Sequence, residues 1–182
     1  MAGFAAGDAR LQGKNVSGKS MSAILNQATI VFRPMSEVDL EQVIAIEEDV
    51  YEFPWSIDIF QDCLSAGYCC WLMEQDDCVS GYGIMSILAD EAHILDLCIK
   101  SDLQNNGLGK EMLDYLIDLA KSHHADVMFL EVRPSNRSAI KIYDKSGFDE
   151  VGIRKDYYPA KIGREDALIL AKQLTDHLLV NH

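Results

Sequence analysis

Hydrophobic residues recur at regular intervals from about residue 28 onward, and their spacing predicts a series of strands and helices. Short apolar runs rich in branched and aromatic residues are typical of strands. Strands are expected at residues 29–33, 68–74, 79–88, 92–99, 127–132, 148–153 and 167–174. Apolar positions three and four residues apart are typical of helices. Helices are expected at about residues 37–48, 56–66, 108–120 and 136–146.

Local signals predict where several of these elements begin and end. Residues 36–39 resemble a capping box at the start of the first helix, and the Phe-Pro-Trp-Ser segment at 53–56 separates it from the second. The two aspartates at 76–77 predict a hairpin turn. Ser135 is expected to cap the last helix, and Gly147 is expected to end it in a left-handed conformation.

The order of these elements predicts the fold class. Antiparallel hairpins come first, and strands that alternate with helices follow. This order predicts an α/β fold, with one central mixed sheet of about seven strands and about four helices on both of its faces. The domain is expected to span residues 27–175 and to be followed by a short tail at 176–182.

Residues 1–26 differ from the rest, because glycine, alanine and serine are frequent and apolar residues are scattered. They are expected to form a flexible extension or a leader that is not native. Residues 13–20 match the phosphate-loop pattern G-x-x-x-x-G-K-S. A functional phosphate loop follows a buried strand, and no apolar strand precedes this one, so nucleotide hydrolysis is not expected there.

The composition narrows the location and the ligands. No apolar run approaches the ~20 residues that span a bilayer, so a cytoplasmic protein with no membrane partner is expected. The five cysteines include no C-x-x-C pair, and the five histidines fall at no metal-ligand spacing. Reduced thiols and no metal are therefore expected. The net charge of −13 would repel nucleic acid and suits a basic macromolecular partner, although solubility alone explains it equally well.

Residues 104–110 carry the most informative motif, in which Q-x-x-G-x-G follows an apolar run and opens a long helix. Gly107 and Gly109 let the backbone come close to a ligand, and the free N–H groups of a helix N-terminus attract phosphate oxygens. A pyrophosphate site is one interpretation of this loop. Tight packing of the helix on the sheet is the other.

Two side chains further along are candidates for proton transfer. Glu131 interrupts an apolar strand, so its carboxylate must be paired, face a cavity or have a raised pKa. A general base and a carboxylate paired with Arg133 or Arg137 fit this position equally well. Tyr143 is a candidate proton donor on the following helix. Its spacing alone favours ordinary packing against Phe148.

These motifs together resemble a known family. Residues 104–110 and the segment LEVRPSNRSAIKIYDKSGF at 130–148 resemble the GNAT superfamily of N-acetyltransferases. Within it, residues 53–56, 157–159 and 163–167 are similar to the bacterial ribosomal-protein alanine N-acetyltransferases. The resemblance covers about residues 29–174.

The resemblance implies acetyl-CoA as the acetyl donor and assigns residues to it. The backbone of one strand would hold the acetyl carbonyl and the pantetheine, at Leu97, Cys98 and Ile99. Main-chain amides would wrap the pyrophosphate at Gln104, Asn105, Asn106, Gly107, Leu108, Gly109 and Lys110. Asn136 would bind the pantetheine arm. Family members often carry a basic residue where Asn105 and Asn106 stand, and Lys110 is expected to compensate.

The resemblance also assigns the acceptor site and the chemistry. Glu131 would accept the proton of the acceptor amine through water, and Tyr143 would protonate the departing thiolate. The N-terminus of the acceptor would be framed by Phe53, Trp55, Tyr157 and Tyr158.

The expected function is direct transfer of acetyl from acetyl-CoA to a protein N-terminus, the alanine of a basic small-subunit ribosomal protein. An α-amino group with a pKa near ~7.7–8.0 needs far less deprotonation than a lysine near ~10.4. Direct attack needs no enzyme nucleophile, so Cys98 is expected to be a buried strand residue. Two alternatives stay open: acetylation of a small amine or lysine side chain, and an acyl-CoA-binding module without turnover.

Overall fold

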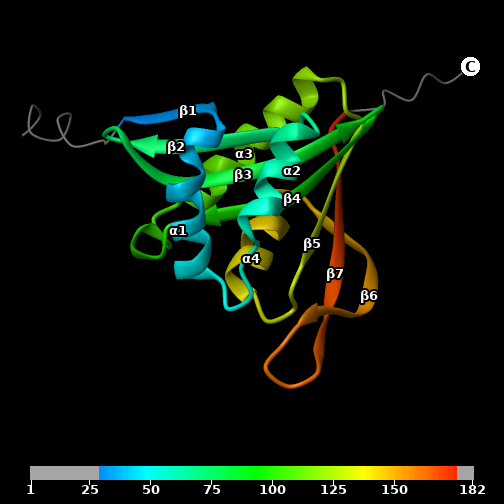
Figure 1. Ribbon diagram of the computed structural model, residues 1–182. Coiled ribbons are helices and arrows are strands. Elements are labelled where there is room, and N and C mark those ends of the chain that lie inside the picture. Colours follow the sequence, from blue (N-terminus) through cyan, green and yellow to red (C-terminus); the bar gives the residue numbers. More distant parts are fainter. Residues whose placement is uncertain (1–28, 176–182) are drawn as a thin grey trace, which may run out of the picture.

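The computed structural model describes residues 29–175, which fold around one seven-stranded sheet (Figure 1). The strands are β1 Ile30–Pro34, β2 Cys69–Gln75, β3 Cys78–Leu88, β4 Glu91–Ile99, β5 Val127–Val132, β6 Asp149–Pro159 and β7 Arg164–Gln173. The helices are α1 Leu40–Val50, α2 Ile57–Ser65, α3 Leu108–Ser122 and α4 Arg137–Lys145, with 3-10 turns at Glu37–Asp39 and Ser101–Leu103. The expected extension at 1–26, the phosphate-loop match at 13–20 and the tail at 176–182 lie outside the described residues.

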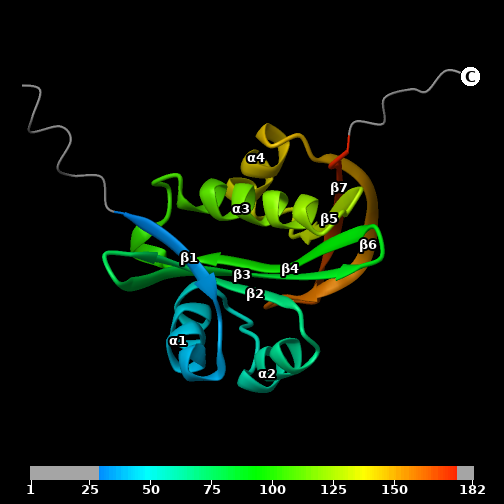
Figure 2. The same cartoon turned by 90° about the horizontal axis from the view of Figure 1, so that it is seen from above.

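The sheet is mixed, with the strand order β1-β2-β3-β4-β5-β7-β6. β4 and β5 run parallel, and the other neighbouring strands run antiparallel. Figure 2 shows α1 and α2 on one face of the sheet and α3 and α4 on the other. The α/β fold, the mixed sheet and the helices on both faces are therefore as predicted.

Each face of the sheet has its own apolar core. Met112, Leu116 and Ala120 of α3 are fully buried, as their spacing predicts. Leu113 and Ile117 are buried as well, so the apolar face of α3 is wider than the predicted stripe. A second cluster, between the sheet and α1 and α2, includes Phe60, Leu72 and Tyr82. Among residues 29–175, no helix is long and apolar enough to cross a membrane.

The parallel strands β4 and β5 stay together over only part of their length. They pair from Glu91 and Val127 as far as Ile94 and Leu130, and the pairing stops there. The register of β4 against β3 shifts at the same level, which leaves Leu95 without a partner in β3. A bulge of this kind bends a strand. The two strands therefore separate beyond Ile94 and Leu130.

Two local predictions differ from the structure. The N-cap of α4 is Asn136, whose side-chain oxygen accepts from the N–H of Ala139 at 3.1 Å, so the cap lies one residue after Ser135. β6 extends to Pro159 and β7 begins at Arg164, so this hairpin is longer than the pattern predicts. β6 is an edge strand whose side chains are mostly exposed, and it therefore shows little hydrophobic alternation.

Candidate active site

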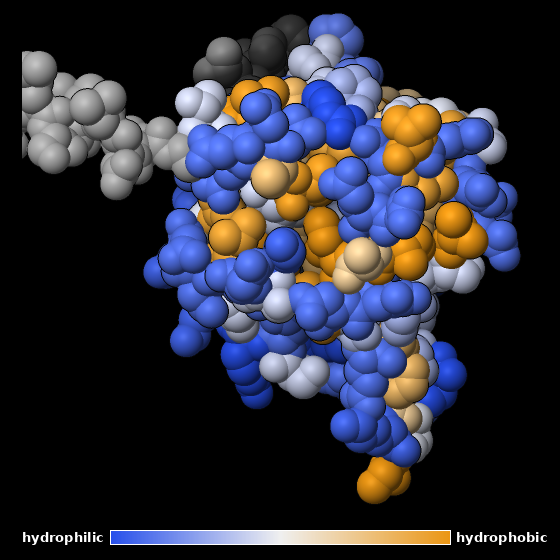
Figure 3. Space-filling model, turned by 60° about the vertical axis from the view of Figure 1, so that its left-hand side comes forward, coloured by the Kyte–Doolittle hydropathy of each residue, from blue (hydrophilic) through white to orange (hydrophobic). Residues whose placement is uncertain are grey.

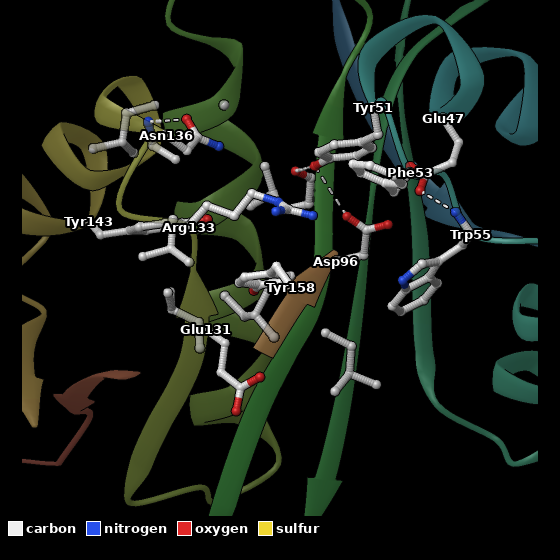
Figure 4. Close-up of a pocket in the computed structure, with 18 of the residues that line it drawn as sticks. Glu47, Tyr51, Phe53, Trp55, Asp96, Glu131, Arg133, Asn136, Tyr143 and Tyr158 are labelled. Carbon is white, nitrogen blue, oxygen red and sulfur yellow. Dashed lines mark hydrogen bonds between the residues drawn. The ribbon is translucent and has the colours of Figure 1, made fainter. Parts of the chain in front are cut away.

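A pocket of about 320 Å³ opens where β4 and β5 separate (Figure 4). β4 and β5 form two of its walls, and residues of α1, the segment from α1 to α2, α3, α4 and the end of β6 complete the lining. Eight of the residues predicted from sequence line it: Phe53, Trp55, Leu97, Gly109, Glu131, Asn136, Tyr143 and Tyr158. The other predicted residues do not: Cys98, Ile99, Gln104, Asn105, Asn106, Gly107, Leu108, Lys110 and Tyr157.

The glycine loop meets the pocket at Gly109 and presents a row of free amides. Within residues 29–175, the N–H groups of residues 105–109 donate to no protein acceptor. Gly107 has a φ of +91°, which favours glycine, and a Cβ there would find nothing within 4 Å. The loop thus has a row of unbonded N–H donors at the N-terminus of α3, an arrangement that suits phosphate oxygens.

Lys110, which is expected to compensate for the missing basic residue at Asn105 and Asn106, forms an ion pair within α3. The ammonium of Lys110 forms an ion pair with Asp114 one turn along α3. Both side chains are about half exposed, so the pair is weak and the ammonium remains available to solvent.

Glu131 is paired, but not with either arginine considered from the sequence. Its carboxylate accepts from Nη1 of Arg154 on β6 at 2.6 Å, whereas Arg133 binds Glu165 on β7. Glu131 also lines the pocket, with 28% of its side chain exposed. The two sequence interpretations are therefore compatible, because the carboxylate is both paired and accessible.

Tyr143 serves packing and faces the pocket. Its ring meets Phe148 edge-on at 5.8 Å, as its spacing predicts. Burial, with a smaller contribution from the charge of Asp96, raises the pKa of Tyr143 above its usual value. The phenol therefore keeps its proton at neutral pH, as a proton donor must.

Cys98 is 2% exposed and belongs to the core between the sheet and α1 and α2. Burial raises the pKa of its thiol, so little thiolate forms. The prediction of a buried strand residue is confirmed.

Aromatic side chains from the segment between α1 and α2 and from β6 also line the pocket. Trp55 packs against Phe60 at 5.5 Å, and its backbone N–H donates to Oε1 of Glu47 at 2.8 Å. Tyr158 lies under the guanidinium of Arg133, 4.3 Å from the ring centroid, and Tyr157 contacts Tyr158 from outside the pocket. These contacts fix the positions of the aromatic groups.

Sequence reasoning missed a second group of polar residues in the pocket: Glu47, Tyr51, Asp96 and Arg133. Asp96 interrupts an apolar strand just as Glu131 does, and that signal could have identified it. Glu47 lies on the buried face of an amphipathic helix and is only 2% exposed. In the described part of the chain, no group of three His, Cys, Asp or Glu residues is placed to hold a metal ion.

The pocket, the glycine loop and the fold agree with the comparisons. A family model described as the acetyltransferase (GNAT) family matches residues 38–148, and the chain belongs to this family of acetyltransferases. Acetyl-CoA is the acetyl donor of the family. The structure of a Salmonella typhimurium protein with its cofactor acetyl-CoA shares the fold, with a TM-score of 0.67, 19% identity and coverage of 84% of this chain and 98% of that one.

Relatives with higher sequence identity to this chain are ribosomal protein bS18-alanine N-acetyltransferases. The chain is 35% identical over 137 residues to the ribosomal protein bS18-alanine N-acetyltransferase of Escherichia coli K12, an alignment covering 75% of this chain and 93% of that protein. The crystal structure of the ribosomal-protein-S18-alanine N-acetyltransferase from Escherichia coli matches with a TM-score of 0.79 and 31% identity. That match covers 85% of this chain and 99% of the other.

Proposed function

We propose that this acetyltransferase acts on the N-terminal α-amino group of a protein, by direct attack of the amine on the thioester of acetyl-CoA. The observation that carries the proposal is the pocket between β4 and β5. Three residues predicted for the donor (Leu97, Gly109 and Asn136) and three predicted for the acceptor (Phe53, Trp55 and Tyr158) line it together. The 35% identity to the Escherichia coli enzyme supports the N-terminal alanine of ribosomal protein bS18 as the acceptor.

The donor would bind along the glycine loop and α4. The free amides of residues 105–109 would hold the pyrophosphate, and the backbone of Leu97 would hold the acetyl end. The side-chain oxygen of Asn136 already accepts from Ala139, so its amide NH₂ is the group left for the pantetheine arm. Acetyl-CoA, when bound, supplies the activated acetyl group.

The protein's own groups would move the protons. Glu131 would accept the amine proton through water, and Tyr143 would give its proton to the departing thiolate. An α-amine with a pKa near ~7.7–8.0 is already partly neutral at pH 7, so a carboxylate base suffices.

While its N-terminus occupies the first pocket, the rest of the acceptor chain would lie in a second pocket of about 500 Å³. The two pockets share Tyr51, Phe53, Arg133 and Pro159. The β6–β7 hairpin beside it projects from the body of the molecule, and Figure 3 shows a hydrophobic surface at its lower end. Ile162, between the two strands, is 94% exposed. Ile162 also lines the second pocket, so the acceptor chain would contact it there.

Charge supports a basic acceptor. The chain carries a net charge of −13, which would speed its encounter with a basic ribosomal protein. A ribosomal acceptor and five free cysteines both fit a cytoplasmic location.

Mass spectrometry after incubation with acetyl-CoA tests the proposal. The acceptors are a basic peptide with a free N-terminal alanine and an internal lysine, and the same peptide with its N-terminus blocked. Label on the α-amine of the first and none on the second is expected. Label on lysine alone, or on small amines alone, would contradict the proposal.

A further inference from the structure

Two carboxyl groups that the proposed mechanism does not use lie against one wall of the pocket. Glu47 comes from α1 and Asp96 comes from β4, and both line the pocket (Figure 4). The hydroxyl of Tyr82, which is fully buried on β3, lies between them. It contacts Oε2 of Glu47 and lies 3.1 Å from Oδ2 of Asp96.

The available protons do not satisfy both carboxylates if both are ionised. Tyr82 has one hydroxyl proton, so it donates to Glu47 or to Asp96 but not to both. The backbone N–H of Trp55 serves the other oxygen of Glu47 at 2.8 Å. The hydroxyl of Tyr51 lies 3.4 Å from Oδ1 of Asp96 and closer, at 3.2 Å, to the carbonyl oxygen of Leu97. The backbone N–H of Leu97 also donates to Asp96. Neither tyrosine hydroxyl is committed to Asp96, because each also lies within reach of another acceptor.

One cation or one extra proton would complete this arrangement. The acceptor of the proposed reaction brings both, because its terminal ammonium carries three N–H donors and one proton that must leave before the nitrogen attacks. We propose that Asp96, supported by Glu47 through Tyr82, is a second catalytic group of this site, which binds the acceptor ammonium and takes its proton. This inference rests on the proposed function.

The proton transfer balances without any further reactant. One N–H bond of the ammonium breaks and an O–H bond forms on Asp96, which leaves a neutral amine with its lone pair. The lone pair then attacks the thioester carbonyl, and the C–S bond breaks. The nitrogen is positively charged after the attack and loses its second proton, through water, to Glu131. The proton on Tyr143 goes to the thiolate, and the second proton of the nitrogen restores the phenol of Tyr143 through solvent. The first proton returns to solvent from Asp96.

The electrostatics of the wall support this role. Burial, with a further contribution from the charge of Glu47, raises the pKa of Asp96 to about 8. This value lies close to that of an α-amino group, ~7.7–8.0, which is the match that efficient proton transfer needs. Burial also raises the pKa of Glu47.

The titratable groups around Asp96 come from each element packed against it. They are Glu47 from α1, Tyr51 after it, Cys63 from α2, Tyr82 from β3, Cys98 from β4 and Tyr143 from α4. Arg133 is the cationic side chain of the pocket lining, and its guanidinium is bound to Glu165 and to the carbonyl of Pro159.

Glu131 and Asp96 differ in what holds them. One oxygen of Glu131 is bound by Arg154, and Figure 4 shows its carboxylate pointing away from Tyr51 and Asp96. Asp96 lies beside Tyr51, near Phe53 and Trp55, where the acceptor is proposed to enter. The two carboxylates would thus serve the acceptor nitrogen from different sides, Glu131 through water and Asp96 directly.

Two isosteric variants test the inference through the pH dependence of kcat with an α-amine peptide. In Asp96→Asn, kcat is expected to fall on the order of 10²-fold, with KM for acetyl-CoA within about twofold of wild type. In Glu47→Gln, the loss of one negative charge lowers the pKa of Asp96, so the acidic limb of kcat is expected to move to lower pH. Asp118→Asn, an exposed position on α3, is the matched control and keeps the wild-type profile.

A wild-type kcat in Asp96→Asn, or an acidic limb that stays in place in Glu47→Gln, would overturn the inference. A merely structural role lowers kcat without moving the acidic limb of the pH profile.

Infrared spectroscopy of the wild-type protein with isotope-labelled aspartate gives a readout that needs no variant. A protonated carboxylic acid band is expected to disappear as pH rises through about 8, and its absence at lower pH would also overturn the inference. Failure of the proposed function is distinct, because it shows as no α-amine acetylation by wild type.

Discussion

The guanidinium of Arg154 on β6 reaches across β7 to the carboxylate of Glu131 on β5, with 2.6 Å between Nη1 and Oε1. The same guanidinium lies 4.8 Å from the ring centroid of Tyr157. One ion pair thus joins the proposed base to the strand that also carries the acceptor-side tyrosines.

Replacing Glu131 by Gln is expected to lower kcat by ~10²–10⁴-fold, because general-base catalysis contributes about that much. Acetyl-CoA affinity is expected to be unchanged. Steady-state kinetics and calorimetric titration measure the two effects. Arg154→Gln is the matched control, since an exposed ion pair contributes only about 0–1 kcal/mol, and kcat is expected to change less than about fivefold. Equal losses in both variants would contradict a catalytic role for Glu131.

Tyr143→Phe is expected to slow the release of free CoA without weakening acetyl-CoA binding, because the variant keeps the ring that packs on Phe148 and loses the proton. Since burial raises the pKa of Tyr143 above its usual value, the wild-type rate is expected not to fall up to a pH of about 10. A thiol-trapping assay across the pH range measures both. Unchanged thiol release in the variant would rule out Tyr143 as the proton donor.

Gly107→Ala is expected to destabilise the fold by roughly 1 kcal/mol and to weaken acetyl-CoA binding, because φ is +91° there and the loop amides would shift. Gly67→Ala is the matched control. Gly67 also has a positive φ, +73°, with open space around its Cβ position, but it lies after α2 and outside the pocket lining. Urea unfolding is expected to show similar losses of stability in both. Acetyl-CoA affinity is expected to fall in Gly107→Ala only.

Glu52→Lys is expected to raise KM for basic acceptor peptides about threefold to tenfold, because one charge contact at a surface is worth roughly 1 kcal/mol. Glu52 lines the second pocket and lies 3.2 Å from Lys161 on the β6–β7 loop. The effect should shrink as salt is added. Asp118→Lys makes the same charge change at an exposed position of α3 and serves as the control. An equal rise in KM in Asp118→Lys would contradict the prediction, because KM would then depend on the net charge of the protein and not on the position of Glu52.

Asp39→Asn tests a structural contact far from the chemistry. Hydrogen bonds from Arg33, only partly offset by burial, lower the pKa of Asp39 from its usual 3.8 to about 2. A lowered pKa in the folded state stabilises the protein above pH 3.8, and this stabilisation is lost as pH falls through about 2. The variant is expected to lose roughly 1–2 kcal/mol at pH 7, discounted because Arg33 is partly exposed. Urea unfolding at several pH values should show the difference shrinking below about pH 4.

More of the fold than of the candidate site could be predicted from the sequence. The apolar face of α3 and the apolar runs of β2 to β5 could be predicted, because these residues pack in the core and their burial determines the hydrophobic spacing of the sequence. The partner of Glu131 was not predictable, because Arg154 lies 23 residues away on an exposed strand. Asp96 carried the same signal as Glu131. The proximity of Glu47 and Tyr82 to it depends on how α1 packs over β3 and β4, which no local pattern records.

The four paired positions between β4 and β5, Glu91–Ile94 with Val127–Leu130, also set the mechanics of the molecule. They are the ladder that joins β1–β4 to β5–β7, and all of it lies at one end of the two strands. The open end has no main-chain bonds to fix its width. A substrate lying there would bridge the two halves of the sheet in place of the missing ladder, so occupancy of the pocket and rigidity of the whole domain are coupled properties.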